Sequence, residues 1–390
     1  MTDIYKRPDL AKKMADQLLN PGPLDEGLRS GLFLSGQRRT GKTTFLINDL
    51  VPALEAAGAL VIYVDLWSDV SANPSDLIRA AVREKLREVQ TPASGLLQRL
   101  KRINSAELAA YGVSFSFNLD TVGQSGGVTL AAALTELVDQ ARVNVVFIVD
   151  EVQHAITTED GQSMLFALKS ARDAINPRPD TPGRFLFIGT GSHRAHVNEL
   201  VARRNQAFTG ATSLPYPVLG VEYVAHLLAR LSKDPDFPTP SLPVAAAAFT
   251  ALGCRPEEML KALRNLPAPD TEGSAPPDVA LPLIAKTLRS SAADLEISKV
   301  ENLGPLAVAV FDRVASKDQD VQGIFSREAA AEYSSALGRT VRVEDVQPVA
   351  NALMSENVIM RSGHGSYSVS DPFVRDIWRE RRGLERRLSE

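Results

Sequence analysis

The first part of the chain, residues 1–219, alternates between short apolar runs and longer amphipathic segments. The apolar runs contain few polar positions, which is the pattern of strands buried on both faces of a parallel sheet. They predict five strands at residues 31–35, 60–64, 145–149, 184–190 and 213–219. Apolar residues recur at helical spacing in the segments between these runs. The alternation predicts a doubly wound α/β fold, in which ligands bind at the carboxyl ends of the strands.

Two segments depart from this pattern. In residues 112–120, Val113, Phe115 and Phe117 alternate with polar residues, which predicts a half-buried strand outside the central sheet. Residues 266–282 contain five prolines and predict a linker or surface excursion.

The end of the chain reads as a separate unit. Helices are predicted at residues 306–314, 326–337 and 343–355, and Ser326 is a suitable N-cap for the second of them. A strand, a turn and a second strand follow over residues 358–369. Three helices followed by a β-hairpin are the arrangement of a winged helix.

Composition excludes several classes of protein. The chain has 390 residues, 44% of them apolar and 23% charged, which suits two or three globular domains. Its net charge of −4 gives no global electrostatic case for nucleic-acid binding. Cys254 is the only cysteine, so neither an internal disulfide nor a cysteine-based zinc site is expected. The start of the chain lacks the apolar core of a signal peptide, and the apolar runs are too short to span a bilayer. We therefore expect a cytoplasmic protein without a membrane partner.

One motif identifies candidate chemistry. It follows the first strand and fits the phosphate-binding pattern G-x-x-x-x-G-K-[ST] through Gly36, Gln37, Arg38, Arg39, Thr40, Gly41, Lys42 and Thr43, with Thr44 opening the next helix. Glycines allow backbone N–H groups to curl around a phosphate, and the helix N-terminus adds positive potential. Lys42 is suited to reach the β- and γ-phosphates, and the Thr43 hydroxyl to ligate Mg²⁺. The motif predicts that these nine residues bind a nucleotide.

A pair of acids ends the third strand. Asp150 and Glu151 follow the apolar run at residues 145–149. In a P-loop enzyme the first acid helps to hold Mg²⁺, as a Walker B aspartate does, and the second polarises the attacking water as general base. The alternative is an acidic pair that only caps a strand; the phosphate-binding motif upstream favours the catalytic interpretation.

With these motifs, the chain resembles the AAA+/STAND group of P-loop ATPases, particularly the archaeal-type ATPase family that is also found in bacteria. The resemblance rests on Gly36–Thr43, on Asp150–Gln153 and on Gly189–Ser192 after the fourth strand. It implies ATP and Mg²⁺ as cofactors and a helical lid after the sheet. We therefore expect four parts: a P-loop ATPase core at 1–219, a lid at 220–265, a linker and helical connection at 266–300, and a winged helix with an arginine-rich final helix at 301–390.

The resemblance also suggests roles for individual side chains. Thr190 or Ser192 stands where a sensor-1 residue contacts the γ-phosphate or the water; a strand-terminal turn is the alternative. Arg255 matches the start of the sensor-2 helix, although an exposed structural arginine is equally compatible. Arg204, with its neighbour Arg203, lies where an arginine finger acts on an adjacent subunit; a solvated charge pair is the alternative. In the loop, Arg38 or Arg39 can also fold back on the protein.

Three functions are compatible with this pattern. The first is a slow ATPase switch whose nucleotide state controls oligomerisation or binding of a protein partner. The second is a DNA-associated loader, initiator or transposition-type ATPase that binds DNA through the winged helix and the arginines of the tail. Acidic residues outnumber basic ones over residues 301–390, which favours protein contacts. The third, a small-molecule kinase, is disfavoured by the Asp150–Glu151 pair.

Overall fold

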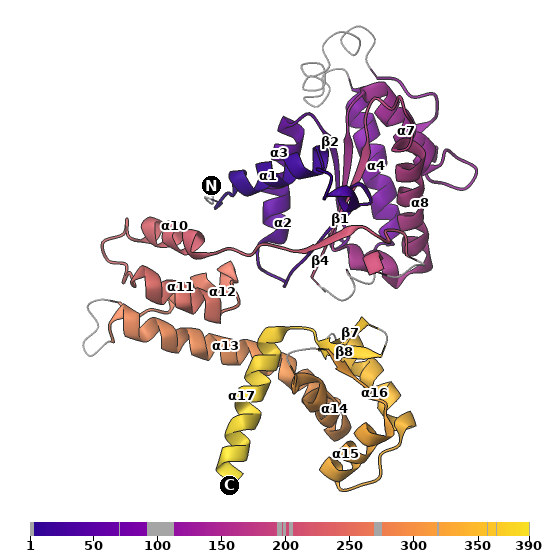
Figure 1. The fold of residues 1–390 in the computed structure, drawn as a ribbon. Coiled ribbons are helices and arrows are strands. Elements are labelled where there is room, and N and C mark those ends of the chain that lie inside the picture. Colours follow the sequence, from indigo (N-terminus) through magenta and orange to yellow (C-terminus); the bar gives the residue numbers. More distant parts are fainter. Residues whose placement is uncertain are drawn as a thin grey trace. The chain divides into compact units, whose positions relative to one another are not determined.

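A computed structural model describes residues 4–69, 71–91, 113–192, 197, 200–202, 206–268, 275–317, 320–356, 358–363 and 365–389 (Figure 1). The chain divides into two compact units. The first comprises residues 1–36 and 42–216, and the second comprises residues 37–41 and 217–390.

The first unit is built on a five-stranded parallel sheet. Its strands are β1 (Leu32–Ser35), β2 (Leu60–Asp65), β3 (Val145–Asp150), β4 (Phe185–Gly191) and β5 (Thr212–Pro215). They lie in the order β2-β3-β4-β1-β5, and every neighbouring pair is parallel. The five predicted strands are therefore present, although the fifth ends at Pro215 and not at residue 219. Because β4 lies between β1 and β3, the residues that follow these three strands meet at one edge of the sheet.

Helices cover both faces of this sheet (Figure 1). One face carries α1 (Pro8–Leu19), α2 (Lys42–Phe45), the π-helical η2 (Leu46–Leu50) and α3 (Val51–Ala56). The other carries α4 (Pro74–Gln90), α7 (Leu130–Ala141) and α8 (Glu159–Ile175). Short 3-10 turns complete the unit: η1 (Glu26–Arg29), η3 (Leu119–Thr121) and η4 (Val152–Thr157). Asn73, Thr129 and Thr158 cap α4, α7 and α8, each accepting a backbone N–H with its side chain.

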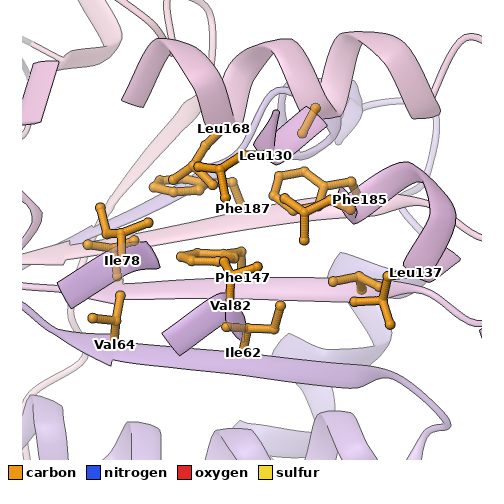
Figure 2. Packing of buried hydrophobic residues seen from close by; sticks show 14 of the residues in the cluster. Ile62, Val64, Ile78, Val82, Leu130, Leu137, Phe147, Leu168, Phe185 and Phe187 are labelled. Atoms are coloured by element: carbon orange, nitrogen blue, oxygen red, sulfur yellow. The ribbon is translucent and has the colours of Figure 1, made fainter. Parts of the chain in front are cut away.

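The strands divide their side chains between two cores. In β3, Phe147 packs with α4, α7 and α8, whereas Val146 and Ile148 pack with the helices of the opposite face. Figure 2 shows the first of these cores, in which Phe147, Phe185 and Phe187 from the sheet meet residues of the covering helices. Burial on both faces explains why these strands read as continuous apolar runs. The doubly wound α/β prediction is confirmed.

Gly189 is required where β4 passes β1. A Cβ atom added there would lie 2.7 Å from the ring of Phe33, and Phe33 itself is fully buried. Gly189→Ala is therefore expected to lower the free energy of unfolding by about 1–3 kcal/mol through overpacking. Chemical denaturation of the full chain measures this effect, with Gly383→Ala as control because no atom lies within 4 Å of that added methyl. An unchanged denaturation midpoint in Gly189→Ala would contradict the tight packing described for this position.

The strand predicted at residues 112–120 is wrong for the described part, residues 113–120, which contains no strand. The alternation is real, because Phe115 and Phe117 stack with ring centroids 5.5 Å apart and pack against the core. The polar positions between them are satisfied locally: the backbone N–H of Ser116 donates to Glu136 at 2.7 Å. Alternate side chains of this segment are buried, which gives its sequence a period of two although the described residues form no strand.

The second unit begins with helices. They are α10 (Val221–Leu231), α11 (Leu242–Ala251), α12 (Pro256–Arg264) and the long α13 (Pro277–Asn302). The prediction of a linker over 266–282 is wrong at its end, because α13 starts at Pro277 and continues through Pro282. Pro277 opens the helix, where its missing N–H has no intrahelical partner, whereas Pro282 lies inside the helix. In the described part of the chain, no helix is long and apolar enough to cross a bilayer.

The rest of the second unit contains three more helices, a small sheet and a final helix. The elements are α14 (Pro305–Ala315), β6 (Val321–Gln322), α15 (Arg327–Leu337), α16 (Val343–Ser355), β7 (Ile359–Gly363), β8 (Ser366–Val369) and α17 (Pro372–Ser389). The strands form an antiparallel sheet in the order β6-β8-β7. Ser326 accepts the N–H of Ala329 and caps α15, as its side chain predicted.

Candidate functional site

The phosphate-binding motif joins β1 to α2. The N–H of Gly36 donates to the carbonyl of Gly191 at 3.1 Å, which ties the start of the loop to the end of β4. Arg39 and Gly41 have left-handed backbones, with φ of 63° and 90°. The buried Thr40 hydroxyl donates to the carbonyl of Gln37 at 2.8 Å. Such strain in a tightly bonded loop is typical of a functional site.

Lys42 is the cation of this loop. Its side chain is only 6% exposed, and its ammonium donates to the carbonyl of Gly36 at 2.6 Å. The ammonium therefore lies back across the loop, beside the backbone N–H groups at the start of α2. A positive charge combined with a helix N-terminus favours an anionic ligand.

Asp150 is the first of the two acidic residues in the site, and it is fully buried. It accepts hydrogen bonds from the hydroxyls of Thr43 at 2.6 Å, of Tyr63 at 3.2 Å, and of Thr190. Burial, and then the charge of Asp150, raise the pKa of Tyr63, so its hydroxyl stays protonated and acts as a donor. The structure thus brings together Thr43, Asp150 and Thr190, three residues that the sequence predicted for one site.

Glu151 follows with a left-handed backbone, at φ 55° and ψ 43°. Its carboxylate accepts bonds from the side chain of Gln153 and from the backbone and hydroxyl of Ser192. Burial opposes ionisation, but the bonds from Gln153 and Ser192 and the charge of Lys42 outweigh it and lower the pKa of Glu151. Glu151 is therefore a carboxylate at neutral pH, able to accept a proton.

The remaining predicted residues lie in several places. Arg38, Arg39 and Thr44 are exposed, and the carbonyl of Thr44 accepts the side-chain amide of Asn48 at 3.0 Å. Arg204 lies outside the described residues. Their predicted roles stay predictions.

Arg255 is the N-cap residue of α12 in the second unit. Its guanidinium forms an ion pair with Asp371 and lies over the ring of Phe373, 5.0 Å from the centroid. The predicted contact of Arg255 with a γ-phosphate is untested by these contacts and stays a prediction.

Sequence reasoning did not assign Tyr63 to this region. Tyr63 stands inside an apolar strand, and only the pairing of β2 with β3 places its hydroxyl against Asp150. The backbone N–H of Arg7 donates to Asp49 at 2.9 Å, and its guanidinium lies over Phe45 and Tyr216. These contacts fix the start of α1 to the helix that follows the phosphate-binding loop. A polar residue within an apolar strand was the one available signal for Tyr63.

Comparisons with known proteins agree with this geometry. Residues 26–196 match the sequence model of a family described as an AAA domain. This match includes the phosphate-binding loop and the Asp150–Glu151 pair. No curated protein sequence matches the chain.

The fold of the chain is similar to that of solved structures. The ORC2 protein of Aeropyrum pernix in ADPNP-ADP complexes is 14% identical, with a TM-score of 0.50 over 98% of this chain and 96% of that one. The ADP form of the same protein is 13% identical, with a TM-score of 0.53 over 97% and 93% of the two chains. At this identity the likeness concerns the fold alone.

Proposed function

We propose that this protein is an ATP-binding, Mg²⁺-dependent ATPase that works as a switch, with its nucleotide state controlling self-association or the binding of a protein partner. The observation that carries the proposal is the hydrogen bond of 2.6 Å between Thr43 of the loop and the buried Asp150. It joins the phosphate-binding loop to the acid that a P-loop ATPase needs beside its metal ion.

The donor set fits Mg²⁺. Thr43 and Asp150 present a hydroxyl and a carboxylate, the hard oxygen ligands that Mg²⁺ prefers. Among the described residues, no three His, Cys, Asp or Glu side chains gather as a metal site. Mg²⁺ in nucleotide sites is typically held by one or two protein ligands together with phosphates and water, so this sparse set is sufficient.

The chain's own residues have distinct roles in the proposed reaction. Lys42 neutralises phosphate charge, and the loop backbone with the N-terminus of α2 orients the nucleotide. Glu151 accepts the proton of the attacking water, while Thr190 or Ser192 contacts the γ-phosphate or that water. The solved structures of similar fold contain ADP or ADPNP, which supports the choice of an adenine nucleotide.

The second unit carries the proposed output of the switch. We assign α10 to α12 to a helical lid, and α14 to α16 with the β6-β8-β7 sheet to a winged helix. This assignment is supported by the order of helices followed by an antiparallel hairpin. The ion pair between Arg255 and Asp371 links the N-cap residue of α12, the last lid helix, to the residue that precedes α17.

DNA binding is the second candidate function, because arginines are concentrated in α17. Several of them already contact groups of the same unit: Arg381 pairs with Asp294, Arg382 lies 3.5 Å from Asp312, and Arg379 donates to the carbonyl of Ala315. Binding to phosphates would have to replace these contacts. The charges of α17 thus favour a structural role, and a partner other than DNA.

A comparison of nucleotide states separates the two functions. The ATP state is represented by Glu151→Gln with Mg²⁺ and ATP, and the ADP state by the wild type with ADP. Light scattering measures the molar mass of each state, and fluorescence anisotropy measures the affinity of each for duplex DNA. We expect the molar mass, or the affinity for a protein partner, to differ between the two nucleotide states. The affinity for DNA should stay weak in both states. Tight DNA binding in the ATP state, falling steeply with salt, would instead support the loader function.

A further inference from the structure

Gln153 lies two residues after Glu151, within η4, and only 5% of it is exposed. Its side-chain amide Nε2 donates to Oε2 of Glu151 and, at 3.2 Å, to Oγ of Ser192. One buried side chain thus contacts both the acid after β3 and the polar residue after β4.

Three donors converge on a single oxygen of Glu151. Besides Gln153, Ser192 donates to Oε2 through its backbone N–H at 3.2 Å and through its hydroxyl at 2.9 Å. Among the residues that the structure describes, none donates to Oε1. The carboxylate is therefore held in one rotation, with Oε2 bonded to protein donors and Oε1 bonded to none of the described residues.

The packing around Gln153 is shaped for this contact. A Cβ atom added at Gly191 would lie 2.4 Å from Oε1 of Gln153, so only glycine leaves room for the carboxamide. That Oε1 is buried and, within the described part of the chain, accepts no hydrogen bond. Leaving this buried oxygen without a hydrogen bond costs free energy. Rotating the amide by 180° would place the same oxygen against the carboxylate of Glu151, and two acceptors cannot form a hydrogen bond. The hydrogen bond to Glu151 therefore sets the orientation of the carboxamide, although its oxygen then accepts no bond from the described residues.

We propose that Gln153 is a positioning residue for ATP hydrolysis, which together with Ser192 aims Oε1 of Glu151 at the attacking water. The inference rests on the proposed ATPase function. In that reaction the water oxygen bonds to the γ-phosphorus as the bond to the β,γ-bridging oxygen breaks. The water's proton passes to Oε1 of Glu151, and ADP leaves with the bonding electron pair. In this proposal Gln153 acts through its hydrogen bonds to Glu151 and Ser192.

Two variants of similar volume test this role. Gln153→Glu replaces the donor by an acceptor, and Gln153→Met removes all hydrogen bonding but keeps the length of the side chain. Each is expected to lower kcat at least about 10-fold, a part of the 10²–10⁴-fold that a general base contributes. The KM for ATP should stay within about twofold, since Gln153 bonds to Glu151 and Ser192 and the substitution leaves the phosphate-binding loop unchanged. Thermal melting shows whether each variant is folded.

Two further measurements identify the route of the effect. Adding Gln153→Met to Glu151→Gln should not slow single-turnover hydrolysis further. Carbon-13 NMR of side-chain-labelled glutamate, with the Glu151 signal assigned by its loss in Glu151→Gln, should show a changed carboxyl chemical shift in Gln153→Met at neutral pH even without nucleotide. An unchanged kcat in both variants, an equal loss in the Glu151→Gln background or an unchanged Glu151 signal would overturn the inference. If the wild type binds ATP without hydrolysing it, the proposed function fails, while the NMR spectrum still decides whether Gln153 holds Glu151.

Discussion

Replacing Lys42 by alanine is expected to abolish ATP binding, with a loss of affinity of about 100-fold or more. The ammonium is nearly buried within the loop, where its hydrogen bond to Gly36 fixes its position. Its removal leaves the charges of the β- and γ-phosphates without their nearest cation. A hydrogen bond to a charged group contributes about 1.5–3 kcal/mol. One such bond to each of the two phosphates accounts for at least the expected factor, at about 1.4 kcal/mol per tenfold change in affinity.

The control for this variant is Lys13→Ala, which removes an exposed lysine of α1 outside the loop. It should bind ATP as the wild type does. Circular dichroism and melting without nucleotide establish that both variants are folded. Retention of ATP affinity within threefold in Lys42→Ala would show that the loop at Gly36–Thr43 is not the nucleotide site.

Glu151→Gln is expected to keep ATP binding and to lower turnover by about 10²–10⁴-fold, the contribution of a general base. The amide preserves the shape of the side chain but cannot accept the water's proton. Because the pKa of Glu151 is lowered, wild-type turnover should persist well below neutral pH and be lost as the carboxylate becomes protonated. The variant should show no such acid limb.

Glu159→Gln is the matched control for this substitution, because Glu159 is an exposed acid in the first turn of α8. Its turnover should equal that of the wild type. Nucleotide affinity and turnover are measured on the same preparations. Wild-type turnover in Glu151→Gln would remove Glu151 from the mechanism and leave it as the cap of η4.

The sheet and the loop were predictable because their signals are local. Continuous apolar runs locate strands buried on both faces, and the spacing of Gly36, Lys42 and Thr43 follows from the geometry of a loop around phosphate. Asp150 was found for the same reason, since an acid directly after a buried strand lies at the ligand-binding edge of the sheet.

Other features depend on contacts between distant segments. The role of Tyr63 follows from the register of β2 with β3, which pairs Asp65 with Asp150, and no local pattern encodes it. The position of Gln153 against Ser192 follows from β4 lying beside β3. The linker prediction for residues 266–282 relied on proline content, but Pro277 opens α13, where a helix accepts proline. Pro282 lies inside α13, which packs against α11 and α12, and no local pattern encodes that packing.

The most direct test of the ATPase proposal is a calorimetric titration of the purified chain with ATP in the presence of Mg²⁺. We expect saturable binding of one nucleotide per chain, lost in Lys42→Ala and kept in Glu151→Gln. Absence of saturable binding to the wild type, or equal binding to Lys42→Ala, would contradict the assignment of this loop as an ATP site.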